Sequence, residues 1–224
     1  MITVLDETQR THAPREFIVS GRPQPIPERP ERIDMLLAGV RQAGSRIVAP
    51  PEIFGDTLAT VHDRRYIQFL STVWERWRRI PDAAASPSAN VFALGRSTLP
   101  PVSYPDSVVG PCGYHLGDGS CPITAQTWAA ARASAATAVH GAMLVLAGER
   151  LVYALCRPPG HHAAADVAAG FCYFNNAALA AETLTRAGRR TAILDIDVHH
   201  GNGTEAIFYD RADVLTVSIH ADPK

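Results

Sequence analysis

The sequence runs Thr191-Ala192-Ile193-Leu194-Asp195-Ile196-Asp197-Val198-His199-His200-Gly201-Asn202-Gly203 towards its C-terminal end. Its apolar start, residues 191–196, predicts a buried strand, because such runs are typical of parallel sheets covered on both faces. Strand side chains alternate with a period of two, so Asp195, Asp197 and His199 are expected on one side. In α/β sheets, ligands bind just beyond the carboxyl ends of the strands. This stretch therefore predicts an α/β fold with a ligand site at this strand end.

The rest of the chain alternates between predicted strands and predicted helices. Apolar runs predict strands at residues 2–5, 47–49, 151–156 and 214–219, and helical spacing predicts helices at 31–43, 57–79, 124–147 and 175–187. Two Pro-rich stretches, residues 8–30 and 81–121, lack a period and are expected to be loops. We therefore expect one domain, residues 1–224, with a parallel sheet, helices on both of its faces and a long loop insertion at 81–121.

Composition and charge exclude several classes of partner. The chain has 21 basic and 22 acidic residues and a formal net charge of -1, so it has no broad field to attract nucleic acid or anionic lipid. No apolar run approaches the roughly 20 residues of a membrane-spanning helix, and the N-terminus lacks the pattern of a signal peptide. We therefore expect a cytoplasmic protein without a nucleic-acid or membrane partner.

The two aspartates at the end of the predicted strand indicate a bound cation. Adjacent carboxylates in a partly buried site are costly unless a cation compensates them, and Asp with His suits zinc. The alternative is that Asp195 caps a helix while the histidines pack in the core, which accounts for only one of these residues. A second pair, His161 and His162, follows the strand at 151–156 through a Pro-Pro-Gly turn. Adjacent histidines also occur on exposed loops, but histidine suits a general base that activates water.

Several blocks of sequence together resemble the histone deacetylase superfamily. The blocks are Arg157-Pro158-Pro159-Gly160-His161-His162, Gly170-Phe171-Cys172-Tyr173-Phe174-Asn175-Asn176 and Asp195-Ile196-Asp197-Val198-His199-His200-Gly201-Asn202-Gly203-Thr204. Upstream, Val61-His62-Asp63 and the long insertion after Trp74 look most like the bacterial acetylpolyamine amidohydrolases. The resemblance implies an arginase/deacetylase-like fold and a zinc-dependent hydrolase that removes acetyl groups from acetylated polyamines or similar small amines.

The resemblance also implies catalytic roles. Asp197 and His199 match two of the three protein ligands of the catalytic zinc, and His162 matches the general base. His161, which pairs with Asp195, matches the residue that stays protonated and stabilises developing charge. Asn202 would orient His162 where some relatives carry a carboxylate, and a neutral partner should make that imidazole less basic.

The resemblance also implies a substrate tunnel, a structural potassium ion and a homodimer. Phe171, with Gly170 before it, resembles the aromatic wall of a substrate tunnel, and the alternative is that Phe171 is a core residue. Glu16 matches an acidic position at the tunnel mouth, and Asp118 is the only acidic residue near the other such positions. A structural potassium ion is expected at Asp195, Asp197, His199, Ser218 and Ile219. By similarity to the bacterial enzymes, a homodimer is expected to form through residues 81–121.

The sequence also departs from the family pattern. It contains no counterpart of the family's third zinc ligand, an Asp, or of the Tyr that polarises the scissile carbonyl. We therefore expect that the deacetylase domain lacks its C-terminal part here, and that the chain is either a fragment of a longer polypeptide or a catalytically silent metal-binding module. A protein lysine deacetylase is the alternative enzyme. An arginase-type two-metal ureohydrolase would need further ligands that this sequence does not supply.

Overall fold

A computed structural model of the chain describes residues 1–92 and 104–222. The strands are β1 (Ile2–Val4), β2 (Glu16–Val19), β3 (Arg22–Pro25), β4 (Arg46–Val48), β5 (Val152–Ala154), β6 (Thr191–Asp195) and β7 (Val214–Ser218). The helices are the 3-10 helix η1 (Glu7–Thr11), α1 (Glu31–Gln42), α2 (Gly55–Leu58), α3 (Arg64–Trp77), α4 (Val109–His115), α5 (Thr127–Leu146), α6 (Asn176–Arg186) and α7 (Asn202–Phe208). The fold is α/β, as predicted.

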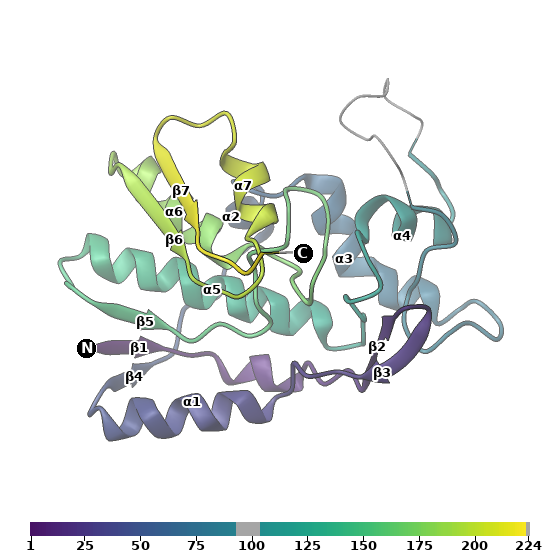
Figure 1. Cartoon of the computed structure of the whole chain (residues 1–224), viewed down its shortest axis with the longest axis horizontal. Helices are drawn as coiled ribbons and strands as arrows, with labels where there is room; N and C mark the ends of the chain where they lie inside the picture. Colours follow the sequence, from purple (N-terminus) through teal and green to yellow (C-terminus); the bar gives the residue numbers. More distant parts are fainter. Residues whose placement is uncertain (93–103, 223–224) are drawn as a thin grey trace.

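The parallel strands lie in two sheets in the described part of the chain. One has the order β4-β1-β5, and the other pairs β6 with β7. Figure 1 shows α1 and α5 on opposite sides of the first sheet. Leu5 and Leu155, which follow β1 and β5, pack against Ile33 and Leu37 of α1. The predicted parallel sheet with helices on both faces is therefore present.

Helices α6 and α7 cover one face of the β6–β7 sheet. Ile193 of β6 and Val214 of β7 pack against Ala178 of α6 and Phe208 of α7. The side chain of Leu194 points to the opposite face and is 62% exposed. The expectation that this strand is buried on both faces is therefore wrong for the described residues, because both helices pack on the same side.

Helix α5 is the central helix of the fold. Its small side chains let it pack closely against α6, β5, β1 and η1. It is also long and apolar enough, by length and composition, to cross a membrane, contrary to the expectation that no segment approached that length. Core helices pass the same test, and 61% of this segment is buried inside the protein. We therefore assign α5 to the core.

Two regions expected to be loops contain regular structure. Residues 8–30 include the antiparallel hairpin β2–β3, whose turn residues Ser20 and Gly21 both have positive φ, as two-residue hairpin turns require. Residues 81–121 include α4, whose Cys112 is fully buried in the main core, so the expectation of a loop throughout is wrong there. Residues 93–103 of that insertion lie outside the described residues.

Candidate functional site

The chain segments that follow β5 and β6 bring the predicted catalytic residues together. His161 Nδ1 lies 2.8 Å from Asp195 Oδ2, and its Nε2 lies 3.9 Å from Asp197 Oδ1. The ring of His162 lies 4.0 Å from that of His161 and 5.9 Å from that of His199, measured between centroids. Two pieces of sequence that are separate in the chain therefore form one cluster of carboxylates and imidazoles.

His162 is held in one orientation by Asn202, the first residue of α7. Its Nδ1 lies 2.7 Å from the amide oxygen of Asn202, which can only accept a hydrogen bond. The proton therefore sits on Nδ1, and the lone pair of Nε2 is free. Partial burial lowers the pKa of His162, and the neighbouring His161 and His199 lower it further. His162 is thus a neutral imidazole with a basic nitrogen at Nε2.

Asp197 and His199 form the second half of the cluster. Asp197 Oδ1 accepts the backbone N–H of His199 at 2.8 Å and lies 3.1 Å from His199 Nδ1. Burial works to raise the pKa of Asp197, but the hydrogen bond from His199 and the charges of His161 and His199 outweigh it and lower that pKa. The carboxylate is therefore ionised and available as a ligand.

The Asp197–His199 pair fits part of a zinc site. Neighbouring ligand atoms of a tetrahedral zinc lie about 3.3 Å apart, close to the 3.1 Å between these two atoms. Both side chains are accessible, with exposures of 50% and 72%. Within residues 1–92 and 104–222, no group of three His, Cys, Asp or Glu side chains is arranged to hold a metal ion. Among the described residues, the pair could therefore contribute two ligands of such a site.

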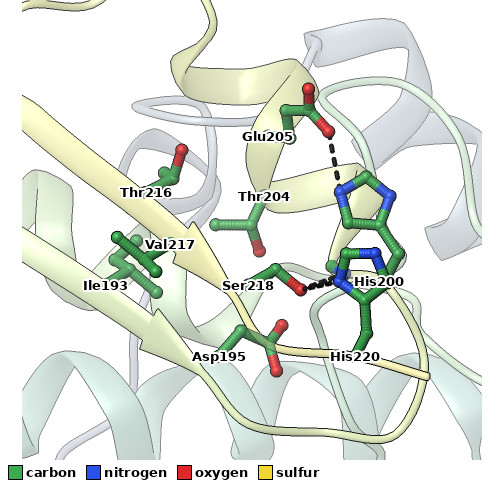
Figure 2. Close-up of a pocket in the computed structure, with 10 residues that line it drawn as sticks. Ile193, Asp195, His200, Thr204, Glu205, Thr216, Val217, Ser218 and His220 are labelled. Carbon is green, nitrogen blue, oxygen red and sulfur yellow. Dashed lines mark hydrogen bonds and ion pairs between the residues drawn. The ribbon is translucent and has the colours of Figure 1, made fainter. Parts of the chain in front are cut away.

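The expected potassium ligands Asp195 and Ser218 lie at paired positions of β6 and β7. They line a pocket of about 230 Å³, which Figure 2 shows together with His200, Glu205 and His220. The Ser218 hydroxyl is 2.9 Å from His220 Nδ1, and His200 Nε2 is 2.8 Å from a Glu205 oxygen. The sequence analysis did not predict a role for His200, Glu205 or His220, although His200 stands within the Asp/His motif at residues 195–203.

Of the expected substrate-binding residues, Gly170 lies directly against the ring of His162. Gly170 has a φ of 53°, and a Cβ there would come within 2.2 Å of the His162 ring. Phe171 makes an edge-to-face contact with Phe17 of β2, with a centroid distance of 5.2 Å. The sequence reasoning missed Phe17, whose only signal was its place beside Glu16. Glu16, Phe17 and Asp118 line a neighbouring pocket of about 500 Å³.

Arg157 anchors the loop that carries the two histidines. Its guanidinium is 3% exposed and donates to the main-chain oxygens of Gln9 and His12, at 2.7 and 2.5 Å. Its Nε lies 2.9 Å from a carboxylate oxygen of Glu28, which is equally buried. Burial lowers the pKa of Arg157 and raises that of Glu28. The sequence reasoning missed this ion pair, whose signal was an Arg at the start of the histidine motif.

Comparison with known proteins identifies the family. The family described as histone deacetylase domain matches residues 26–224. Acetylpolyamine amidohydrolase 2 of Pseudomonas aeruginosa is 42% identical over 236 residues, which cover 100% of this chain and 64% of that protein. Acetylpolyamine amidohydrolase of Mycoplana ramosa is 40% identical over 228 residues, which cover 100% of this chain and 65% of that protein.

A solved structure agrees with these sequence matches. The crystal structure of acetylpolyamine aminohydrolase from Burkholderia pseudomallei superimposes with a TM-score of 0.93 at 43% identity, covering 100% of this chain and 64% of that one. The chain thus spans slightly less than two thirds of the length of these relatives. Since the family match extends over most of its residues, the chain belongs to the histone deacetylase domain family.

Proposed function

We propose that this chain provides the acid–base residues and two metal ligands of a zinc-dependent amidohydrolase that removes acetyl groups from acetylated polyamines or similar small amines. The observation that carries the proposal is the orientation of His162. Asn202 holds its Nδ1 proton and leaves Nε2 free beside the Asp197–His199 pair. Relatives named acetylpolyamine amidohydrolase support the substrate class.

Asp197 and His199 would hold the zinc ion, as two ligands of a catalytic site. When bound, zinc supplies Lewis acidity for the amide carbonyl and makes water acidic enough to ionise near neutral pH. The donor set supports this assignment, since a carboxylate oxygen and an imidazole nitrogen are both ordinary zinc ligands. Asp195 and Ser218 are proposed to hold a potassium ion beside it, which would offset the repulsion between the two aspartates.

His162 and His161 would handle the protons of the reaction. His162 Nε2 accepts a proton from the attacking water and then gives it to the nitrogen of the leaving amine. His161 would act in its doubly protonated form, with its Nδ1–H donated to the Asp195 carboxylate and its Nε2–H donated to the oxygen that becomes negative. The water oxygen joins the acetyl carbon and the C–N bond breaks, which yields acetate and a free amine.

The aromatic pair Phe17 and Phe171 would bind the alkyl chain of the substrate. Glu16, which is exposed at the adjoining pocket, would attract a cationic amine. These features support a polyamine chain over an uncharged one. A protein lysine deacetylase is the second candidate, and the same walls would accept an acetyllysine side chain.

The test is a single substitution, His162→Ala, with His140→Ala in α5 as the matched control. Acetate release from acetylputrescine, acetylspermidine and an acetyllysine peptide would be measured together with zinc content. We expect His162→Ala to lose at least about 100-fold in kcat, the usual contribution of a general base, and to keep its zinc. Retained activity would overturn the assignment of His162. If the unsubstituted protein prefers the peptide, the result would support a lysine deacetylase. If it is folded but has neither zinc nor activity, the result would support a silent module.

We also propose that the protein forms a homodimer through residues 81–121. The length of this insertion and the similarity to the bacterial amidohydrolases support the proposal. Sedimentation at several concentrations tests it, and shortening the insertion should then shift the sedimenting species from dimer to monomer. A monomer at all concentrations would refute it.

A further inference from the structure

One turn of the chain, residues 118–119, contacts both segments that carry the aromatic pair. Asp118 Oδ2 accepts the backbone N–H of Gly170 at 3.0 Å, and Phe171 is the next residue. The main-chain oxygen of Gly119 accepts the N–H of Ile18 at 3.0 Å, and Phe17 is the residue before it. The spacing between the two rings therefore depends on this turn.

The Asp118 carboxylate uses both of its oxygens inside the protein. Oδ1 accepts the backbone N–H of Ser120 at 2.8 Å, while Oδ2 accepts that of Gly170. Hydrogen bonds to an ionised acceptor are roughly twice as strong as neutral ones. The side chain is also half-buried, unlike the exposed Glu16 of the same pocket. Asp118 is thus directed towards the main chain of its neighbours.

Asp118 holds the backbone directly before Phe171, a residue in an unfavourable conformation. Gly170 and Phe171 both have positive φ, 53° and 67°, and such a φ is a genuine outlier for a bulky residue. Outliers of this kind persist only where surrounding contacts impose them. The N–H of Gly170 is bound by Asp118, and the Cα of Gly170 lies against the His162 ring. If this hydrogen bond were lost, both Phe171 and the face of His162 would be free to shift.

We propose that Asp118 is a positioning residue, which sets the place of Gly170 and Phe171 against His162 and Phe17 and does not bind the charge of the substrate. The inference rests on the proposed deacetylase function. It separates the two acidic residues of the pocket by role, because Glu16 acts through its charge and Asp118 through the main chain of Gly170.

The test compares Asp118→Asn with Glu16→Gln on two acetylated amines of equal length. N-acetylputrescine carries a cation at its far end, whereas N-pentylacetamide carries a neutral methyl group at the same place. Asp6→Asn is the matched control, because Asp6 accepts the N–H of Thr8 in the same local geometry that Asp118 uses for Ser120 and lies outside the site. We expect Asp118→Asn to lose about tenfold in kcat/KM on both substrates, as one charge-assisted hydrogen bond corresponds to roughly that factor. Glu16→Gln should affect only the charged substrate.

Hydrogen exchange at the Gly170 amide gives a readout that needs no activity. We expect faster exchange there in Asp118→Asn, with amides of α1 and α5 unchanged, and no such change in Asp6→Asn. A loss confined to the charged substrate, or an unchanged Gly170 amide, would overturn the positioning role. An unsubstituted protein that cleaves neither amine would refute the proposed function, while the exchange result would still decide whether Asp118 holds Gly170.

Discussion

Asn202 places its amide oxygen 2.7 Å from Nδ1 of His162. A carboxylate at this position would stabilise the imidazolium, so Asn202→Asp should raise the pKa of His162, which burial otherwise lowers. Because His162 must be neutral to accept a proton, the acid limb of kcat/KM against pH should move to higher pH, by about one unit. Asn202→Ala, which removes the orienting oxygen without adding charge, is the comparison and should lower kcat without this shift. An acid limb that stays in place or moves to lower pH in Asn202→Asp would contradict the prediction.

Gly170→Ala should damage the site more than its backbone strain alone explains. The added Cβ would lie 2.2 Å from His162 Cδ2 and displace the ring from the position in which Nδ1 pairs with Asn202. Gly188→Ala is the matched control, because its φ of 78° gives similar strain but nothing lies within 4 Å of the new Cβ. Each variant should lose about 1 kcal/mol of unfolding free energy from the positive φ. Only Gly170→Ala should lower kcat, and equal kcat values in the two variants would count against the contact with His162.

Arg157→Met should destabilise the protein strongly. It would leave the Glu28 carboxylate buried with only the exposed Arg32, 3.9 Å away, as a cation, and loss of a buried partner typically costs about 3–5 kcal/mol. The double variant Arg157→Met/Glu28→Gln should recover part of that loss, since no buried charge remains. Urea unfolding of the three proteins in a chelator measures the effect. If the double variant were as unstable as the single one, the lost hydrogen bonds to Gln9 and His12 would be the cause.

His62 should make the protein less stable in mild acid. It is buried, its Nε2 accepts the N–H of Asn175 and its Nδ1 lies 3.2 Å from the main-chain oxygen of Ala165, so it must be neutral. Burial lowers its pKa from 6.5 to about 4. The unfolded chain therefore takes up a proton first, and stability that is complete above pH 6.5 is lost as pH falls towards 4.

The slope of the unfolding free energy against pH gives the number of protons that the unfolded chain binds in excess of the folded protein. Between pH 6 and pH 4.5, each proton taken up only by the unfolded chain lowers stability by about 1.4 kcal/mol per pH unit. His62→Gln should reduce the slope by the contribution of one proton. The contribution of His12 should remain, because burial also lowers the pKa of His12, to about 3. Urea unfolding in a chelator at several pH values checks this, and parallel slopes would mean that His62 is already protonated in the folded protein.

Elements with local signals were predicted from the sequence. The helix expected at residues 175–187 is α6, with Asn175 as its N-cap through a hydrogen bond to the Ala178 N–H. Predictions failed where the local signal was weak or ambiguous. The helix predicted at residues 124–147 begins only at Thr127, because the Thr124 hydroxyl accepts the N–H of Gln126 in a turn that precedes α5. Helix α4 and the β2–β3 hairpin were missed because their Pro-rich sequences lack a clear period.

The sequence by itself determined which residue types stand at the strand ends, because hydrophobic period and chain punctuation are local properties. Asp195, Asp197, His199 and the His161–His162 pair could all be located in this way. Only the tertiary structure decided which of them meet and what holds them. His162 and Asn202 are 40 residues apart, Asp118 and Gly170 are 52 apart, and Arg157 and Gln9 are 148 apart. The physical reason is that such contacts depend on how whole elements pack, which no local pattern of residues records.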